Sequence, residues 1–322
     1  MKKIGVLTSG GDAPGMNACI RAIVRSASSR RVEVVGIRRG YWGLINKDMI
    51  PLGEMRVSGI LQRGGTFLDS ERCEDIKTSE GIEKSIEVLK SSGIDGLIVI
   101  GGDGAFRAAT TLAETGGVKV IGIPGTIDND VYGTDFSIGF DTAVNTALQA
   151  IDRIRDSAES LQMLFFVEVM GRSRGFIALA VGIAGGANEI LIPETETNIE
   201  ALSRRLGKRL NKGLKSALVV VAEGETPDGA RSIAEKVGKK VNLGYRCVSL
   251  GHVQRGGAPT AKDRILASEL GVAAVYELLE GQHGVMVGES GSQTTCTPLE
   301  DTWGKRKELD PHLMEMLHTL AV

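Results

Sequence analysis

The residues best suited to chemistry lie in the segment GIPGTIDNDV, which runs from Gly122 to Val131. The hydroxyl group of Thr126 comes two residues before Asp128, and Asp130 supplies a second carboxylate. A positioned carboxylate can take a proton from a hydroxyl group, and carboxylates are also ligands for Mg²⁺. Alternate residues of an extended loop point the same way, and only one of the pair need face a substrate. Asp128 is therefore our candidate general base, and Asp130 is a second candidate for a metal ligand.

Two glycine-rich turns are candidates for binding phosphate. They are TSGGDAPG at 8–15 and GGDG at 101–104, and each follows an apolar run. Glycines after a strand let backbone N–H groups approach an anion, and the helix that follows adds its dipole. The alternative is a tight turn with close helix packing. Neither turn matches a common nucleotide motif, because no GxxxxGK[ST] occurs and Arg107 takes the last position of GxGxxG.

Asp103 stands inside the second of these turns, where its charge would repel phosphate unless a cation lay between them. Mg²⁺ binds one or two carboxylates together with phosphate oxygens. The alternative roles for Asp103 are an Asx-turn or a helix N-cap. Phosphoryl transfer requires a phosphate cradle, Mg²⁺, cationic side chains and a carboxylate that orients the attacking hydroxyl. The glycine turns, Asp103 and Asp128 together predict such a site.

The elements that must position these loops follow from hydrophobic periodicity. Apolar, β-branched runs end in glycine turns within the segments 2–15, 96–106, 118–130, 164–175 and 217–225. Helical spacing occurs between them, for example at Ile82, Ile86 and Leu89, and at Ala143, Ala147, Ile151 and Ile154. Continuous apolar strands that alternate with helices predict an α/β fold with a mostly parallel sheet. Ligands of such sheets bind at the carboxyl ends of the strands, where these glycine turns lie.

Composition excludes several other classes of protein. The 322 residues predict about two domains, and a net charge of −2 with 4% aromatic residues argues against nucleic acid and membrane partners. The longest apolar stretch, FIALAVGIAGGA, is twelve residues, and the N-terminus has no signal-peptide pattern. Four dispersed cysteines predict reduced thiols in the cytoplasm. The four histidines all lie at 252 or later, so we expect no His-based zinc site.

Six motifs of the chain resemble those of one known family. They are GVLTSGGDAPGMN, RGGTFLDSERC, VIGGDG, IPGTIDNDV, EVMGR and LGHVQRGG. In sequence, order and spacing they resemble the bacterial ATP-dependent 6-phosphofructokinases over essentially the whole chain. The resemblance implies two similar three-layer α/β domains, each with a mostly parallel sheet flanked by helices. It also implies ATP, Mg²⁺, phosphorylation of fructose 6-phosphate at its 1-hydroxyl in glycolysis, and a homotetramer whose subunits share sites.

The resemblance further divides the chain into two domains. An ATP-binding domain would comprise 1–139 plus 254–303, and a sugar-phosphate-binding domain would comprise 140–253 plus 304–322. Such a returning segment agrees with the lack of a Pro-rich linker in the sequence.

Site residues are assigned through the same motifs. Asp128 would be the general base, Thr126 would bind the transferred phosphoryl group, and Arg72 and Arg172 would stabilise its charge. The ATP site would consist of Gly11, Arg72, Cys73, Gly102, Asp103, Gly104 and Ala105, with Asp103 as the metal ligand. The sugar-phosphate site would consist of Thr126, Ile127, Asp128, Met163, Met170, Gly171, Arg172, Glu223, Arg246, His252 and Arg255. Arg246 is expected from a neighbouring subunit, and His252 would otherwise be a core histidine.

Two glycines favour ATP as the phosphoryl donor. In pyrophosphate-using relatives, Asp replaces the last glycine of GGDG and Lys replaces the glycine before TIDND. This chain has Gly104 and Gly125 at those positions. Ala105 and Ala108 stand where the family more often has Ser and Gly, which adds methyl groups beside the nucleotide.

The chain departs from the family at two places. Met163 replaces an arginine that reaches a neighbour's sugar 6-phosphate. At the effector site, the pattern that binds ADP or phosphoenolpyruvate is matched by Arg21, Arg25, Arg155 and Lys212. It is broken where Leu214 and Ser216 replace a basic and a polar residue, and Asn188 replaces an acid expected to hold the effector's metal. The alternative for Arg21 and Arg25 is a solvated helix face.

Two alternative functions remain beside an active phosphofructokinase. Met163 motivates a kinase of the same fold that acts on another sugar phosphate. The other alternative is a weakly active subunit that modulates a second phosphofructokinase. The intact set of Asp128, Arg72, Arg172 and Asp103 argues against that regulatory role.

Overall fold

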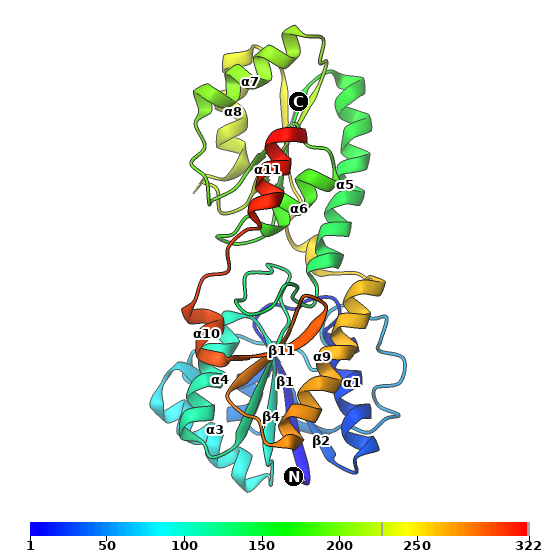
Figure 1. Cartoon of the computed structure of the whole chain (residues 1–322), viewed down its shortest axis with the longest axis vertical. Helices are drawn as coiled ribbons and strands as arrows, with labels where there is room; N and C mark the ends of the chain where they lie inside the picture. Colours follow the sequence, from blue (N-terminus) through cyan, green and yellow to red (C-terminus); the bar gives the residue numbers. More distant parts are fainter. Residues whose placement is uncertain (227, 321–322) are drawn as a thin grey trace. The chain divides into compact units, whose positions relative to one another are not determined.

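The computed structural model describes residues 1–226 and 228–320, which form two compact units (Figure 1). Unit one comprises Met1–Thr142 and Arg255–Lys307, and unit two comprises Ala143–Gln254 and the segment from Glu308 onward. None of the helices in this described part of the chain has both the length and the apolarity that a membrane crossing demands. Which ligand each unit binds stays a prediction.

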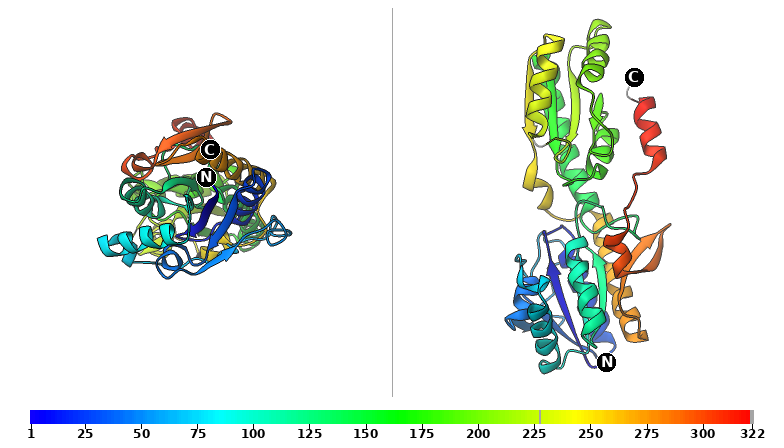
Figure 2. Two further views of the ribbon diagram at one scale, coloured as in Figure 1. Left: turned by 90° about the horizontal axis from the view of Figure 1, so that it is seen from below. Right: turned by 90° about the vertical axis from the view of Figure 1, so that its left-hand side faces the viewer.

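Unit one is built on a seven-stranded sheet in the order β11-β10-β5-β4-β1-β2-β3. Its strands are β1 (Lys3–Ser9), β2 (Glu33–Ile37), β3 (Met49–Pro51), β4 (Gly96–Gly101), β5 (Lys119–Pro124), β10 (Val285–Ser290) and β11 (Gln293–Pro298). The five inner strands are parallel, and the edge strands β3 and β11 are antiparallel to their neighbours. Figure 2 shows the β10–β11 hairpin in orange. The chain order reverses between β1 and β4, and such a switch point is where open α/β sheets bind ligands.

Helices cover both faces of this sheet. They are α1 (Met16–Ser29), α2 (Gly40–Ile45), α3 (Ser79–Ser91), α4 (Asp103–Thr115), α9 (Ala261–Glu280) and α10 (Leu299–Gly304), with a 3₁₀ turn η1 (Asp75–Lys77). Helices α1 and α9 lie side by side on one face, with α3, α4 and α10 on the other (Figure 1). A Cβ on Gly271 of α9 would be 2.9 Å from the Cβ of Ala22 in α1, so only glycine allows this close packing.

Unit two has a four-stranded, all-parallel sheet in the order β7-β8-β6-β9. Its strands are β6 (Leu164–Val169), β7 (Glu189–Leu191), β8 (Ala217–Ala222) and β9 (Tyr245–Ser249). The helices are α5 (Phe140–Leu161), which begins in unit one, then α6 (Phe176–Ala184), α7 (Ile199–Asn211), α8 (Gly229–Val241) and α11 (Pro311–Leu320). Leu164 and Phe166 of β6 pack into one core cluster with α7 and α8. The alternate residues face the opposite side, where α6 packs on β7 and β8.

The predicted fold class is confirmed. All five apolar runs form strands of parallel sheets, namely β1, β4, β5, β6 and β8. The helical spacing from Ile82 to Leu89 belongs to α3, and that from Ala143 to Ile154 belongs to α5.

Candidate active site

Three loops of unit one meet at the carboxyl ends of the adjacent strands β1, β4 and β5. The N–H of Gly125 donates to the carbonyl of Gly101 at 2.9 Å, which joins the β5 loop to the end of β4. A Cβ on Gly102 would be 3.6 Å from the Cβ of Thr126, and one on Gly101 would be 2.5 Å from the carbonyl oxygen of Ser9. The two predicted phosphate cradles therefore lie beside the loop that carries the candidate base.

The Asp128 loop is folded tightly by its own polar groups. The backbone N–H of Asp128 donates to Thr126 Oγ1 at 3.2 Å, and the side-chain oxygen of Asn129 accepts from the N–H of Ser137 at 2.9 Å. Asn129 has a φ of 53°, a left-handed conformation that asparagine tolerates better than most residues. Asp128 is 4% exposed and Ile127 is 2% exposed, so both predicted site residues are buried in unit one.

The segment that carries Arg72 and Cys73 is fastened to the β1 loop. Ser70 Oγ donates to the carbonyl of Gly10 at 2.6 Å. Asn17, which is buried in α1, donates to the carbonyls of Arg63 and Gly64 at 3.1 Å. Arg72 itself is exposed, and burial raises the pKa of the Cys73 thiol, which therefore stays neutral near pH 7.

Asp103 begins α4, and one of its carboxylate oxygens accepts from the N–H of Gly104 at 2.6 Å. Gly102 is the N-cap of this helix and provides no side-chain cap. A Cβ on Gly104 would meet no atom within 4 Å, so the turn borders open space. Ala105 is buried, and its carbonyl accepts from the hydroxyl group of Tyr41 at 2.7 Å. Within the described residues, no three His, Cys, Asp or Glu side chains are grouped so as to hold a metal ion by themselves.

Arg255 joins the predicted ATP and sugar-phosphate residues within unit one. Its guanidinium lies against Gly11, where any Cβ would overlap it. Arg255 Nη1 is 4.0 Å from Asp12 Oδ1, and the buried Nε has no hydrogen-bond partner among the described residues. A guanidinium in this position offers a donor to an anion bound over the β1 glycines.

The sugar-phosphate candidates of unit two fall at opposite ends of its sheet. Met163 immediately precedes β6, and Arg246 pairs in register with Phe165 near the start of the same strand. The others follow the carboxyl ends of the strands and are Met170, Gly171, Arg172, Glu223 and His252. A six-residue strand spans roughly 20 Å. Within one chain, Met163 and Arg246 therefore cannot share a phosphate with Arg172 and His252.

The predicted effector residues are dispersed and partly engaged. Arg21 and Arg25 lie on α1 in unit one, whereas Arg155 and Lys212 belong to unit two. Arg155 donates to the carbonyl of Gly186 at 3.0 Å and also to that of Gly185, at the end of α6. Lys212 is exposed at the C-terminus of α7.

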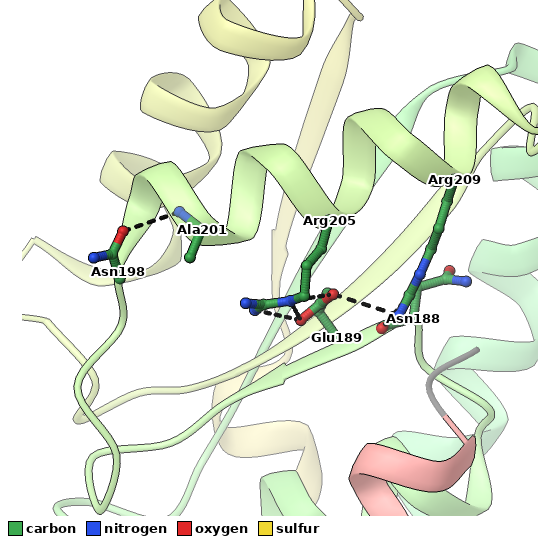
Figure 3. Close-up of polar contacts among 6 residues, drawn as sticks. All are labelled: Asn188, Glu189, Asn198, Ala201, Arg205 and Arg209. Atoms are coloured by element: carbon green, nitrogen blue, oxygen red, sulfur yellow. Dashed lines mark hydrogen bonds and ion pairs between the residues drawn. The ribbon is translucent and has the colours of Figure 1, made fainter.

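Asn188, which stands where the family has an acidic residue, is hydrogen-bonded within unit two. Its side-chain oxygen accepts from the N–H of Leu218 at 2.8 Å, and its carbonyl accepts from Arg209 Nη1 at 2.6 Å (Figure 3). The neighbouring Glu189 forms a forked pair with Arg205 at 2.7–3.1 Å. The side-chain oxygen of Asn188 and the carboxylate of Glu189 are thus both engaged inside the protein.

Comparison with known proteins identifies the family. The phosphofructokinase family model matches residues 3–278. The chain is 54% identical over 322 residues to ATP-dependent 6-phosphofructokinase 1 of Thermus thermophilus, with all of both chains covered. It is 46% identical to the ATP-dependent 6-phosphofructokinase of Halothermothrix orenii, again over the whole of both chains. The solved phosphofructokinase of Pichia pastoris superposes with a TM-score of 0.90 at 33% identity, covering 99% of this chain and 37% of that longer one. The chain belongs to the phosphofructokinase family.

Proposed function

We propose that this chain is an ATP-dependent 6-phosphofructokinase, which transfers the γ-phosphoryl group of ATP to the 1-hydroxyl of fructose 6-phosphate. The relatives that bear this name, at 54% and 46% identity, support the proposal. The observation that carries it is the meeting of three loops in unit one, where the glycines after β1 and β4 lie beside the 126–128 segment. Phosphoryl transfer needs this combination of an anion cradle and a carboxylate. As a glycolytic enzyme, the protein would work in the cytoplasm.

In this proposal, unit one binds the donor and supplies the base. Backbone N–H groups at Gly11 and at 102–105 would hold the ATP phosphates, and Arg72 would offset charge that develops on the γ-phosphoryl group. Asp128 would accept the proton of the sugar 1-hydroxyl as its oxygen forms a bond to the γ-phosphorus. The bond from that phosphorus to the bridging oxygen then breaks and leaves ADP. Thr126 would bind an oxygen of the group in transit.

Asp103 would hold the Mg²⁺ that accompanies ATP. A carboxylate is a hard oxygen donor of the kind that Mg²⁺ prefers, and phosphate oxygens and water would supply the remaining ligands. The support is its position at the uncapped start of α4, beside the glycine turn that borders open space. When bound, the ion would neutralise the β- and γ-phosphate oxygens.

Two glycines of unit one support ATP over pyrophosphate. A Cβ on Gly125 would be 2.8 Å from Ile100 Cγ2 and 3.2 Å from Met16 Cε, so a lysine there would not fit the present packing. An aspartate at Gly104 would project its charge into the space in front of the cradle. The chain therefore lacks both features that distinguish the pyrophosphate-using relatives.

Unit two would bind the sugar phosphate through Arg172, His252 and Glu223. The position of Met163 and Arg246 at the far end of β6 supports their action in a neighbouring subunit's site. We therefore propose a homotetramer in which each sugar-phosphate site is completed by a second chain.

Turnover measurements on the purified full chain test this function. ATP with Mg²⁺ should support phosphorylation of fructose 6-phosphate, and chelation of the metal should abolish it. Pyrophosphate should be at least about a hundredfold poorer in kcat/KM. A panel of other sugar phosphates tests the alternative that Met163 motivates. A better substrate in that panel, or equal rates with pyrophosphate, would overturn the proposal.

A further inference from the structure

The segment 170–175, here called the substrate loop, has an unusual backbone. Gly171 has a φ of 141° and Arg172 a φ of 53°, both in the left-handed range. This conformation is less favourable for arginine than for glycine or asparagine, and Arg31, Arg39 and Lys47 are the other basic residues of the described chain that adopt it. Arg172 is exposed, and the proposed function needs its guanidinium in one place, so contacts that fix its backbone would matter for activity.

The first half of the substrate loop is held from two sides. Gln254, which is fully buried, accepts from the N–H of Met170 at 2.9 Å. The carbonyl of Arg172 lies against Gly224 so closely that any Cβ there would overlap it. Within the loop, the N–H of Arg174 donates to the carbonyl of Gly171 at 2.9 Å.

The second half of the substrate loop is held by Glu194, which comes from a different part of unit two, shortly after β7. Glu194 Oε1 accepts from the N–H of Gly175 at 3.0 Å and lies 3.7 Å from Nε of Arg174. The side chains of Glu194 and Arg174 are only 11% and 10% exposed. A Cβ on Gly175 would be 2.7 Å from Glu194 Oε2, so the carboxylate sits directly against the loop backbone.

We propose that Glu194 is a positioning residue that fixes the backbone of Arg172 for phosphoryl transfer. This inference rests on the role of Arg172 in the proposed function. Glu194 accepts a hydrogen bond from Gly175 and pairs with Arg174, so these two contacts hold the end of the turn that begins at Gly171. Glu194 touches no part of the substrate in this proposal and acts only through the loop.

Glu189, at the start of the strand that precedes Glu194, provides a control. Glu189 begins β7, and its side chain is 8% exposed and paired with Arg205 and Arg209 (Figure 3). It is a buried carboxylate with arginine partners, as Glu194 is, but its recorded partners lie on α7. Removing either carboxylate takes an ion-pair partner from an arginine, namely the buried Arg174 for Glu194 and the more exposed Arg205 and Arg209 for Glu189. Of the two glutamates, Glu194 is the one that contacts the substrate loop.

The test compares kcat, KM and melting temperature in the full chain. Glu194→Ala should lower kcat about tenfold to a hundredfold, because small displacements of a transition-state group are costly. Its KM for ATP should change little, since that site is in unit one. Glu194→Gln keeps an oxygen for the N–H of Gly175 and should restore most of the activity. Glu189→Ala should lower the melting temperature as much as Glu194→Ala but change kcat by less than about threefold.

A double variant separates positioning from general damage. If Glu194 acts through Arg172, then Arg172→Ala with Glu194→Ala should lose no more kcat than Arg172→Ala alone. The proposal would be overturned if the kcat losses of the two single variants multiplied in the double variant. It would also be overturned if kcat fell in parallel with the melting temperature in both Glu189→Ala and Glu194→Ala. If Glu194→Ala does not fold, Arg174→Met, which removes the arginine partner of Glu194, carries the same comparison. An unimpaired Arg172→Ala enzyme would instead refute the role of Arg172 and, with it, this inference.

Discussion

The helices that follow the candidate binding loops begin differently in the two units, although Thr78 and Thr260 cap α3 and α9 elsewhere in unit one. In unit one, the helices that follow the β1 and β4 loops begin behind Gly15 and Gly102, and neither has a side-chain cap. In unit two, Asn198 caps α7 at 2.9 Å (Figure 3), Glu168 accepts from the N–H of Ala230 in α8 at 2.8 Å, and Glu194 accepts from Gly175 before α6. At these two loops of unit one the N-cap residue provides no side-chain acceptor, whereas three helix starts of unit two are engaged by side chains of that unit.

In the proposed function, this difference would give two ways of binding phosphate. Unit one would use backbone N–H groups of its glycine turns, and unit two would use guanidinium and imidazole side chains. Substitutions in unit one should therefore act through space and added charge. Substitutions in unit two should act through the gain or loss of a single cationic contact.

The largest expected effect is at the base in unit one. Asp128→Asn should lower kcat by about two to four orders of magnitude, because proton transfer in the transition state is lost. Sugar-phosphate affinity, measured by equilibrium binding, should stay nearly unchanged. Asp135→Asn is the control, since Asp135 is an exposed carboxylate that accepts from the N–H of Gly291 at 2.7 Å. Retention of more than a tenth of kcat in Asp128→Asn would contradict the assignment.

The glycine cradle gives the next largest effect. Gly104→Asp should lower kcat/KM for ATP about a hundredfold, since an uncompensated like charge beside phosphate costs several kcal/mol. Gly104→Ala is the matched control. Its Cβ would meet no atom within 4 Å, so steady-state rates with ATP should stay near those of the native chain. Equal losses in both variants would mean that space, and not charge, governs this position.

A variant at Met163 tests whether one added cationic side chain strengthens sugar-phosphate binding. Met163→Arg should lower the KM for fructose 6-phosphate about tenfold, because a charge-assisted hydrogen bond contributes roughly 1.5–3 kcal/mol. Uniform binding of this kind leaves kcat little changed. Leu161→Arg, at a 55% exposed position of the same end, is the control. An unchanged KM in a stable, assembled enzyme would show that position 163 does not face the phosphate, and a fall in melting temperature would indicate an apolar interface there.

The smallest expected effect concerns ADP. Its addition should shift the midpoint of the sugar-phosphate saturation curve by less than about twofold, because a ligand must bind two states differently to shift their equilibrium. Asn188 cannot supply an anionic metal ligand, and its side-chain oxygen is already bonded to Leu218. Saturation curves with and without ADP measure this directly. A strong leftward shift would contradict the prediction.

The sequence predicts the local parts of this molecule better than the distant ones. Strands β1, β4 and β5 and their glycine turns are predictable, because an apolar β-branched run followed by glycine is a local pattern. The edge strands are not, since β3 has three residues and β11, with the sequence QTTCTP, is polar and mostly exposed. The contact of Arg255 with Gly11, and the grip of Glu194 on the substrate loop, depend on tertiary packing that periodicity does not encode. Motif resemblance selects Arg172 but gives no sign of Glu194, and it includes Gln254 in LGHVQRGG without indicating that this side chain supports the Arg172 loop.

The return of the chain into unit one has a consequence for its synthesis on the ribosome. Unit two's Ala143–Gln254 emerges as one continuous piece, whereas unit one is complete only after Arg255–Lys307 has followed. Until then α1 lacks its neighbour α9, and the first turn of α5 lacks Asp263, whose buried carboxylate accepts from the N–H groups of Gly139 and Thr142 at 2.9 and 2.8 Å. The apolar face of α1 therefore stays uncovered while the more than one hundred residues of Ala143–Gln254 are translated. A chain that ended before α9 would leave both units incomplete, because unit one would lack α9, β10 and β11 and unit two would lack α11, which packs on α6.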